Sequence, residues 1–335
     1  MNNKTPILID ALYINAGGGL GLLEYLLEVL VDNEIEVCLL KDTRCRRLSC
    51  EEKLHQVYEL KAGLYNRYKF YSRNRTQFRM VLCFANVPCP VKMPCPVYTY
   101  VHNANLLQIP SDFTLLNKIL AYGKQLVIRA LSANTDDWIV QTRNMESLLK
   151  NIVRNKDKVH IIPFYKIPAC EEGPDDRTDY ILVGNYTGTR GHELLLEAWI
   201  RLQKRGRTPV LHLTVDNESF CTLIDKAAND GIKVINHGII SFDKVFDIYR
   251  KCKATVYPSL NESLGLGLIE ALEAGCDVIA PDLPYVWSVC QPSETFDLGD
   301  VDTMVDAILK YDEGKSRNSV LTINNKIEDL IDILR

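Results

Sequence analysis

The sequence predicts an α/β protein with two doubly wound, Rossmann-like domains that face a central cleft. Strand-like runs and amphipathic helical runs alternate along the 335-residue chain. The strand-like runs are apolar on both faces, which is typical of buried parallel strands. The alternation breaks near 165–178 and then restarts. We therefore expect an N-terminal domain at 1–165, a C-terminal domain at 166–315 and a last helical segment at 316–335, which could pack back on the N-terminal domain.

Each expected element has its own local signal. In the N-terminal domain, a strand at 6–14 is followed by a glycine turn at 17–19 and an amphipathic helix at 20–33. The further strands expected there are 35–42, 79–87, 97–103, 137–142 and 158–168. In the C-terminal domain we expect strands at 180–184, 210–216, 232–238, 254–259, 277–282 and 294–298, and helices at 193–205, 218–230, 242–252, 266–275 and 301–314. The segment 323–335 is a final amphipathic helix.

Composition favours an ordinary globular protein. Apolar residues make up 47% of the chain and charged residues 24%. No apolar run approaches the roughly 18 residues that a membrane span needs. The N-terminus has no basic segment followed by a long apolar run, so we expect no signal peptide and a cytoplasmic protein. The 11 cysteines form no Cys-x-x-Cys pair, which favours reduced structural thiols over a zinc or redox site.

Charge is distributed unevenly along the chain. Residues 1–165 carry 21 Lys and Arg against 15 Asp and Glu, whereas 166–335 carry 18 against 28. No acidic residue lies between Glu59 and Asp112. The stretch 61–79 interleaves basic and aromatic side chains: Lys61, Tyr65, Arg67, Tyr68, Lys69, Phe70, Tyr71, Arg73, Arg75, Phe78 and Arg79. Nucleic acid, an anionic membrane surface or a phosphate-bearing substrate could use it, and a solvated basic face is the plain alternative.

Two features of the N-terminal half could bind a ligand. Gly17, Gly18 and Gly19 follow the first strand and precede a helix, a place where backbone N–H groups can approach a phosphate. Leu22 breaks the G-x-G-x-x-G spacing, so a structural turn fits equally well, although Asp42 after the second strand would suit a ribose-binding acid of an NAD site. His102 ends a later strand, as a ligand of the cleft or as a satisfied structural group.

The C-terminal half carries a more specific pattern. Residues 254–275 read as a strand, a loop and a helix that begins near Gly265, whose free N–H groups suit a diphosphate. Glu270 lies about one turn inside that helix, where it could accept hydrogen bonds from ribose hydroxyls. Glu262 lies in the loop and could reach another part of the ligand. The alternative is a surface helix with two solvated glutamates, and we accept that reading for Glu273.

A cation should balance a diphosphate. Arg190 stands in the loop after a strand and just before a helix, where it could bind phosphate oxygens in a bidentate way. A solvated loop arginine is the alternative.

The pattern that these residues form resembles that of glycosyltransferase family 4. Members of this family are retaining enzymes of the GT-B fold that use nucleotide-sugar donors. The spacing of Glu262 and Glu270 matches the E-x7-E motif of that family. The segments 257–290, 234–259 and 181–199 resemble its strand–loop–helix–strand course, its base pocket and its phosphate segment, and 14–21 and 100–103 resemble its glycine loop and donor-sugar histidine.

The resemblance implies a role for each matching residue. Glu270 would bind the donor ribose, and Glu262 the transferred sugar. The backbone of Gly265 and Leu266 would lie near the sugar or diphosphate, His102 would touch the donor sugar, and Gly18 and Gly19 would approach the diphosphate. Asn185 occupies the place where the family commonly has an arginine, and Arg190 the place of its lysine.

The resemblance also implies a metal-independent, retaining hexosyltransferase. Its donor would be a UDP-sugar in preference to a GDP-sugar, and no other cofactor is expected. The acceptor would be a glycan or a lipid-diphosphate-linked glycan in surface-polysaccharide assembly, such as O-antigen or capsule. Separately from the resemblance, our hypothesis for the stretch 61–79 is that it meets an anionic membrane surface, at the inner face of the plasma membrane, or a lipid-diphosphate-linked acceptor, with no role for nucleic acid. Asp300 and Asp302 fit a D-x-D metal motif, but they lie at an expected helix start and are interpreted as capping residues.

Three other functions remain open from the sequence. The first is an NAD-dependent oxidoreductase, which Asp42 favours. The second is a GT-B nucleotide-sugar epimerase, which needs no separate acceptor. The third is a catalytically degenerate sugar-nucleotide binder, because Asn185 removes one expected cation.

Overall fold

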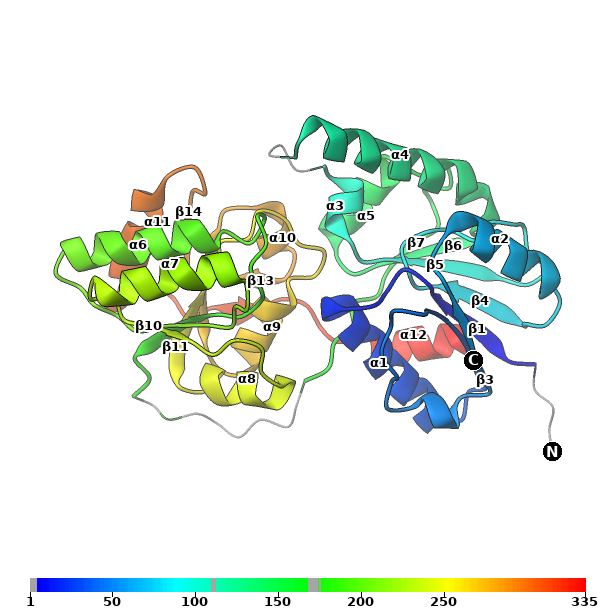
Figure 1. The fold of residues 1–335 in the computed structure, drawn as a ribbon, viewed down its shortest axis with the longest axis horizontal. Coiled ribbons are helices and arrows are strands. Elements are labelled where there is room, and N and C mark those ends of the chain that lie inside the picture. Colours follow the sequence, from blue (N-terminus) through cyan, green and yellow to red (C-terminus); the bar gives the residue numbers. More distant parts are fainter. Residues whose placement is uncertain (1–4, 110–112, 168–173, 175) are drawn as a thin grey trace. The chain divides into compact units, whose positions relative to one another are not determined.

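The computed structural model describes residues 5–109, 113–167, 174 and 176–335, which form two compact units (Figure 1). Unit 1 holds the residues up to Lys166 together with Asn324–Arg335, and unit 2 holds Ile167–Ile323. The chain therefore returns to unit 1 at its C-terminal end. Each unit is built on a parallel sheet whose strand order reverses inside the sheet, so the prediction of two doubly wound α/β domains is confirmed.

The sheet of unit 1 has seven parallel strands in the order β3-β2-β1-β4-β5-β6-β7. Its strands are β1 (Ile7–Ala11), β2 (Val37–Asp42), β3 (Gln56–Leu60), β4 (Met80–Cys83), β5 (Val97–Val101), β6 (Asp137–Val140) and β7 (Val159–Ile161). Every residue of β1 and β2 is buried. Their apolar runs therefore show no alternation, as expected for strands covered on both faces.

Helices cover both faces of this sheet. α1 (Gly17–Asp32) and the C-terminal helix α12 (Ile327–Leu334) lie on one face (Figure 1). The other face carries α2 (Leu64–Arg73), α3 (Ala104–Leu107), α4 (Leu115–Leu131) and α5 (Arg143–Lys150), and the short 3-10 helices are η1 (Glu51–Lys53) and η2 (Ser132–Asn134). The end of α12 is held by Arg79, whose Nη2 donates to the Leu334 carbonyl at 2.7 Å, and by Arg335, whose Nη2 donates to Asn33 Oδ1 at 2.6 Å.

The sheet of unit 2 has six parallel strands in the order β10-β9-β8-β11-β12-β14. They are β8 (Asp179–Leu182), β9 (Leu211–Leu213), β10 (Val234–Asn236), β11 (Cys252–Val256), β12 (Asp277–Pro281) and β14 (Glu294–Phe296). Its helices are α6 (His192–Lys204), α7 (Glu218–Asn229), α8 (Phe242–Tyr249), α9 (Leu266–Glu273), α10 (Pro284–Trp287) and α11 (Val301–Asp312). A small antiparallel pair joins β13 (Cys290–Gln291) and β15 (Val320–Leu321).

The structure differs from the expected elements in two ways. It adds the strands β3, β13 and β15 and the helices α2, α3, α4, α5 and α10, none of which the sequence analysis expected. The expected glycine turn at 17–19 is wrong: Gly17 already begins α1, with Ala16 as the N-cap. A helix can begin on glycines because its first N–H groups need no intrahelical partner. In the described part of the chain, no helix is long and apolar enough to cross a membrane.

Unit 1 encloses a buried ion pair. Arg67 of α2 and Asp10 of β1 are both 0% exposed, and Arg67 Nε lies 2.7 Å from Asp10 Oδ2. The two terminal nitrogens of Arg67 donate to the carbonyls of Pro88 at 2.6 Å and Val87 at 2.9 Å. The Tyr71 hydroxyl donates to Asp10 Oδ2 at 2.7 Å. Both charges are therefore paired and hydrogen-bonded, the condition under which buried charges are tolerated.

The expectation of one continuous basic and aromatic surface over 61–79 is therefore wrong in part. Arg67, Phe70, Tyr71 and Phe78 are buried in the core of unit 1. The exposed cations of the stretch are Lys61, Lys69, Arg73 and Arg75. Helical geometry explains the division, because α2 turns Arg67, Phe70 and Tyr71 toward the sheet and its other residues outward.

The buried pair makes a stability prediction. Arg67→Met should lower the free energy of unfolding by about 3–5 kcal/mol, because it leaves the Asp10 carboxylate buried without its cation. Urea denaturation followed by circular dichroism measures this loss. Arg73→Met, on the exposed side of the same helix, is the control and should change stability by no more than about 0.5 kcal/mol. Equal effects of the two substitutions would contradict the structural role of Arg67.

Candidate functional site

Two loops of unit 2 meet at the carboxyl ends of neighbouring strands. Residues 183–191 follow β8 and residues 257–265 follow β11, the strand beside it. The Leu260 N–H donates to the Thr189 carbonyl at 2.9 Å, and Ser259 Oγ lies 3.4 Å from the same carbonyl oxygen. In open parallel sheets, ligands bind beyond this edge of the strands. The first loop carries Arg190 and the second carries Glu262, so the structure brings these two predicted residues together.

Glycine allows the two loops to approach closely. A Cβ on Gly191 would lie 2.3 Å from the Pro258 carbonyl oxygen, and Gly191 has a left-handed φ of +68°. A Cβ on Gly184 would lie 2.7 Å from Arg190 Nη1. Both glycines lie in the segment 181–199 that the sequence analysis compared with a phosphate segment, but neither was singled out there. Their position at the end of a strand and the start of a helix is the signal that could have found them.

Arg190, Tyr257 and Glu262 form one polar group. Arg190 Nη1 lies 3.4 Å from the Tyr257 hydroxyl and 3.8 Å from Glu262 Oε1. The Tyr257 hydroxyl donates to Glu262 Oε1 at 3.0 Å, and the Ser259 hydroxyl donates to the same oxygen at 2.9 Å. Both bonds go to Oε1, which leaves Oε2 to accept from a ligand hydroxyl.

Sequence reasoning missed Tyr257, because a tyrosine at the end of an apolar strand reads as core. The side chain is indeed buried. It fits against α9 only because residue 267 is glycine, where a Cβ would lie 2.8 Å from Tyr257 Cε2. Gly267 thus makes room for the tyrosine that contacts both Arg190 and Glu262.

Glu270 lies inside α9, whose N-cap is Gly265 with a left-handed φ of +66°. Among the described residues, no group donates a hydrogen bond to the Glu270 carboxylate. Burial raises the pKa of Glu270 to about 7, and the positive charge of Arg190 opposes this shift. A half-buried carboxylate without a protein donor is an acceptor that a ligand can satisfy. Leu266, which follows the N-cap Gly265, is the first residue of the helix.

Asn185 has a local structural role. Its Oδ1 accepts hydrogen bonds from the N–H groups of Tyr186 at 2.8 Å and Asp216 at 3.2 Å. These bonds connect the loop after β8 to the segment after β9. The residue in the arginine-like place therefore orders the backbone and adds no positive charge.

In unit 1, Gly19 and His102 lie in contact. A Cβ on Gly19 would lie 3.0 Å from His102 Cε1. His102 Nε2 lies 3.0 Å from the Phe84 carbonyl oxygen, and burial lowers the pKa of His102 to about 4. The ring is therefore neutral near pH 7, with its proton on Nε2 and Nδ1 left as an acceptor. Gly18, the preceding residue of α1, is exposed.

The carboxylate of Asp42 forms an ion pair with a neighbouring arginine. It is buried and pairs with Arg44, whose Nη2 lies 2.5 Å from Asp42 Oδ2. The same carboxylate accepts from the Arg44 backbone N–H at 3.0 Å. Hydrogen bonding from Arg44 lowers the pKa of Asp42. This arrangement removes the feature of the sequence that favoured a ribose-binding acid in an NAD site.

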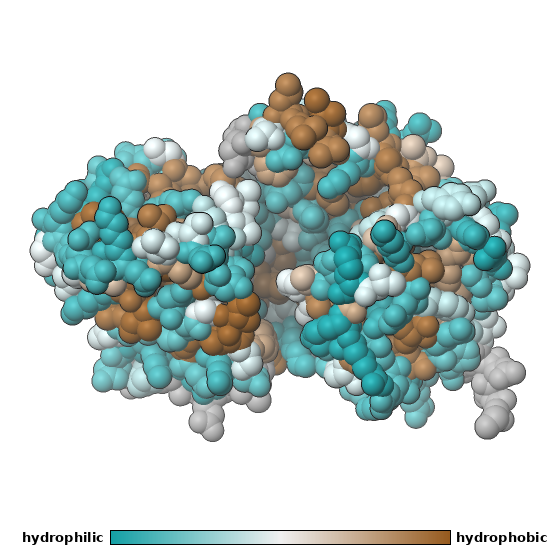
Figure 2. Space-filling model, viewed as in Figure 1, coloured by the Kyte–Doolittle hydropathy of each residue, from teal (hydrophilic) through white to brown (hydrophobic). Residues whose placement is uncertain are grey.

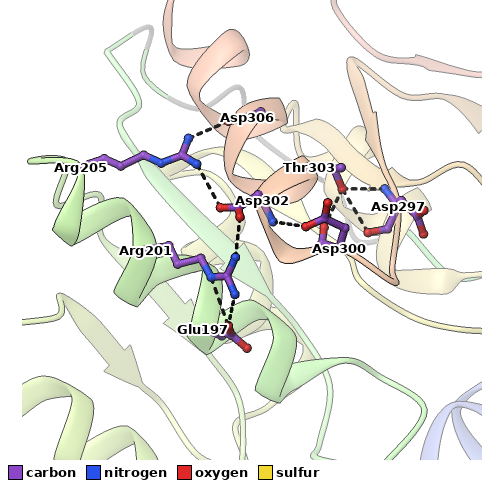
Figure 3. Close-up of polar contacts among 8 residues, drawn as sticks. All are labelled: Glu197, Arg201, Arg205, Asp297, Asp300, Asp302, Thr303 and Asp306. Atoms are coloured by element: carbon purple, nitrogen blue, oxygen red, sulfur yellow. Dashed lines mark hydrogen bonds and ion pairs between the residues drawn. The ribbon is translucent and has the colours of Figure 1, made fainter.

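The D-x-D residues are engaged in capping and ion pairs. Asp300 is the N-cap of α11 and its Oδ1 accepts from the Asp302 N–H at 2.9 Å. Figure 3 shows Asp302 between two arginines of α6, with Arg201 Nη1 at 2.7 Å and Arg205 Nη2 at 3.0 Å. No group of three or more His, Cys, Asp or Glu in the described ranges could hold a metal ion. That the reaction needs no metal stays a prediction.

The position of Glu270 makes a pH prediction. Since its pKa is about 7 in the folded protein and 4.5 in the reference state, the folded protein keeps a proton that the unfolded chain releases between these values. This group therefore reduces stability as pH rises from 4.5 to 7. Glu270→Gln should raise the free energy of unfolding by about 1–3 kcal/mol at alkaline pH and change it little at acidic pH.

Denaturation at a series of pH values measures this difference. Glu273→Gln on the same helix is the matched control, and it should leave the pH profile as in the original chain. A Glu270→Gln variant whose stability gain does not grow with pH would contradict the buried carboxylate.

Comparisons with known proteins concern the fold and the C-terminal half of the chain. Residues 166–326 match the family model described as glycosyl transferases group 1. The chain is similar to a sucrose-phosphate synthase from Thermosynechococcus elongatus, with 17% identity, coverage of 99% of this chain and 95% of that one, and a TM-score of 0.73. It is similar to WaaG, a glycosyltransferase involved in lipopolysaccharide biosynthesis, with 13% identity, coverage of 98% and 99%, and a TM-score of 0.71.

A third similar structure is HepE of Anabaena in complex with UDP and glucose, with 12% identity, coverage of 93% and 91%, and a TM-score of 0.67. No sequence relative matches among curated proteins. At these identities the structural likeness concerns the fold, while the family match covers the part of the chain that carries Arg190, Glu262 and Glu270. The chain therefore has the GT-B fold of two Rossmann-like domains, and its residues 166–326 match the glycosyl transferases of group 1.

Proposed function

We propose that this protein is a retaining glycosyltransferase that moves a sugar from a nucleotide-sugar to a glycan or lipid-linked glycan. The observation that carries the proposal is the meeting of Arg190 and Glu262 beside Gly265, at the start of the helix α9 that carries Glu270. One cation, one helix N-terminus and two acceptor carboxylates are what a sugar diphosphate nucleotide requires. The family match over 166–326 supports the transferase class, and the bound UDP of HepE supports UDP over GDP.

Glu270 is the proposed ribose ligand. Its carboxylate has no protein donor among the described residues, so the vicinal hydroxyls of a ribose would supply the hydrogen bonds that it lacks. Those bonds would stabilise the ionised form and lower the pKa from about 7. Nucleotide binding would therefore offset the unfavourable burial of this carboxylate.

Glu262 is the proposed ligand of the transferred sugar. Tyr257 and Ser259 hold its Oε1, which fixes the direction of Oε2. Arg190 and the N–H groups at Gly265 and Leu266 would stabilise the negative charge that develops on the departing diphosphate. Because Asn185 contributes no charge, Arg190 is the one cation proposed for this task. Retention and independence of a metal are parts of the same proposal.

The residues of unit 1 extend the proposal. A neutral His102 with Nδ1 as acceptor suits a donor-sugar hydroxyl, and Gly18 and Gly19 suit the approach of a diphosphate to the start of α1. For the acceptor we propose a glycan of a surface polysaccharide, with support from the lipopolysaccharide role of WaaG. The exposed cations of 61–79 support an anionic, lipid-diphosphate-linked acceptor and a peripheral position at the inner face of the plasma membrane.

Thermal shift with UDP, GDP, ADP and NAD tests the donor class. A nucleotide at about 100 times its dissociation constant should stabilise the protein by roughly 2.7 kcal/mol. We expect this shift with UDP. A shift with NAD alone would overturn the proposal, although the Asp42 carboxylate is already paired with Arg44.

Two variants test the assigned roles. Glu270→Gln should weaken UDP binding roughly tenfold to hundredfold, because a neutral amide accepts hydrogen bonds less strongly than a carboxylate. Glu262→Gln should keep the UDP shift but lower UDP release from the UDP-sugar by roughly a hundredfold. Glu273→Gln is the control for both. Binding of UDP without release from any UDP-sugar would indicate a degenerate binder, and a changed sugar with no released UDP would indicate an epimerase.

A further inference from the structure

The outer face of α4 in unit 1 is apolar. Leu115 is 75% exposed and Leu126 is 66% exposed. Four more large apolar side chains of this helix are exposed as well: Leu116, Ile119, Leu120 and Tyr122. At 100° per residue these six positions fall within a single face, which also includes Gly123. Figure 2 shows the apolar side chains gathered over α4.

The opposite side of α4 is firmly packed. Ala121 and Ile128 are buried against unit 1. Gln125 Nε2 donates to the carbonyls of Leu106 at 3.0 Å and Leu107 at 3.1 Å, which satisfies the end of α3. The rotation of α4 about its axis is therefore set by its inner face, and the apolar face points away from the core. Monomeric proteins rarely expose a continuous apolar patch of this kind without a partner.

Charge around this face identifies the partner. Residues 113–135 contain Lys118, Lys124 and Arg129 and no acidic residue. By helical geometry, Lys118 and Arg129 flank one side of the apolar face and Lys124 flanks the other. A surface that is apolar in the middle and basic at its edges fits the boundary of an anionic lipid bilayer.

The neighbouring helix α2 adds to the same surface. The connections from β3 to β4 and from β5 to β6 run in the same direction across the sheet. Right-handed crossovers therefore place α2 and α4 on one face, as Figure 1 shows. Leu64, Tyr65 and Tyr68 of α2 are each at least half exposed. Lys69, Arg73 and Arg75 are exposed in and just after this helix.

A second copy of the chain fits this surface less well. A symmetric dimer through α4 would bring the same patch of two copies together. The exposed Lys124 and Arg129 would then meet their own copies with no acidic residue within 113–135 to balance them. An anionic bilayer instead supplies the negative charge and a place for the leucines.

We propose that α4 docks on an anionic lipid bilayer with its outer face inserted at the boundary between headgroups and acyl chains. Leu115, Ile119 and Leu126 enter the apolar layer, and the flanking Lys124 and Arg129 contact lipid phosphates. This deepens the proposed function, because it assigns a lipid surface to the acceptor side of the same protein. It differs from the contact proposed for 61–79, because apolar insertion adds to charge attraction.

Vesicle flotation without any nucleotide-sugar tests this proposal. The full chain should bind vesicles of phosphatidylglycerol and phosphatidylcholine, and bind pure phosphatidylcholine far more weakly. Ile119→Glu with Leu126→Glu should weaken binding to the anionic vesicles by roughly tenfold or more, because each leucine-sized side chain loses its burial. The matched control is Leu223→Glu, an exposed leucine of α7 in unit 2, which should bind as the original chain does.

Salt separates insertion from charge attraction. At about 0.5 M salt, where exposed charges are strongly screened, the original chain should keep measurable binding and the double variant should not. Lys124→Glu with Arg129→Glu should weaken binding at low salt while leaving the apolar face intact. An unchanged UDP thermal shift in each variant shows that the fold is retained and separates this proposal from the donor site.

Three results would overturn the proposal. The first is equal vesicle binding by the Ile119 and Leu126 double variant and the original chain. The second is no binding to anionic vesicles by the original chain. The third is a dimer in sedimentation that the double variant dissolves, because the outer face of α4 would then be covered by a second copy.

Discussion

The hydrogen bond from the Leu260 N–H to the Thr189 carbonyl joins the two loops on which the candidate site depends. It connects the segment after β8 to the segment after β11, two strands that already pair in the sheet. The approach is close enough that a Cβ at Gly191 would overlap the Pro258 carbonyl. Arg190 can lie beside Tyr257 and Glu262 only because these backbones are in contact. The geometry of the charged groups is thus a consequence of backbone packing.

The same site holds its carboxylates in two different states. Glu262 is satisfied by two hydroxyl donors and lies near Arg190, whereas Glu270 is partly buried without a protein donor. Burial raises the pKa of Glu270 to about 7, so the protein gives up some stability to present an unsatisfied acceptor. A ligand with vicinal hydroxyls would recover that loss. Because the carboxylates of Glu262 and Glu270 differ in their hydrogen-bond donors, the two glutamates of the E-x7-E spacing are assigned different roles.

Unit 1 uses its positive charges in two opposite ways. Arg67 turns inward and neutralises Asp10 in the core, where its donors are all engaged by protein groups. The cations of α4 remain at the surface beside a face of leucine, isoleucine and tyrosine. A count of basic residues along the sequence cannot distinguish these cases. Only the rotation of each helix about its axis determines which charges reach a partner.

The sequence by itself determined most strands of the two parallel sheets, the two doubly wound domains and the positions of Arg190, Glu262 and Glu270 at strand and helix ends. These follow from local patterns, because buried parallel strands and helix starts leave signals within a few residues. The tertiary structure decided the rest. Tyr257 can position Arg190 and Glu262 because Gly267 leaves space for its ring. Asn185 accepts a hydrogen bond from the backbone N–H of Asp216, which lies across from it. The Asp42 carboxylate pairs with Arg44, and Arg67 is buried. The leucines of α4 are exposed. Except for the Asp42–Arg44 pair, whose members are two residues apart, these outcomes depend on which surfaces meet in three dimensions. Contacts between residues far apart in the chain leave no periodic trace in a single sequence.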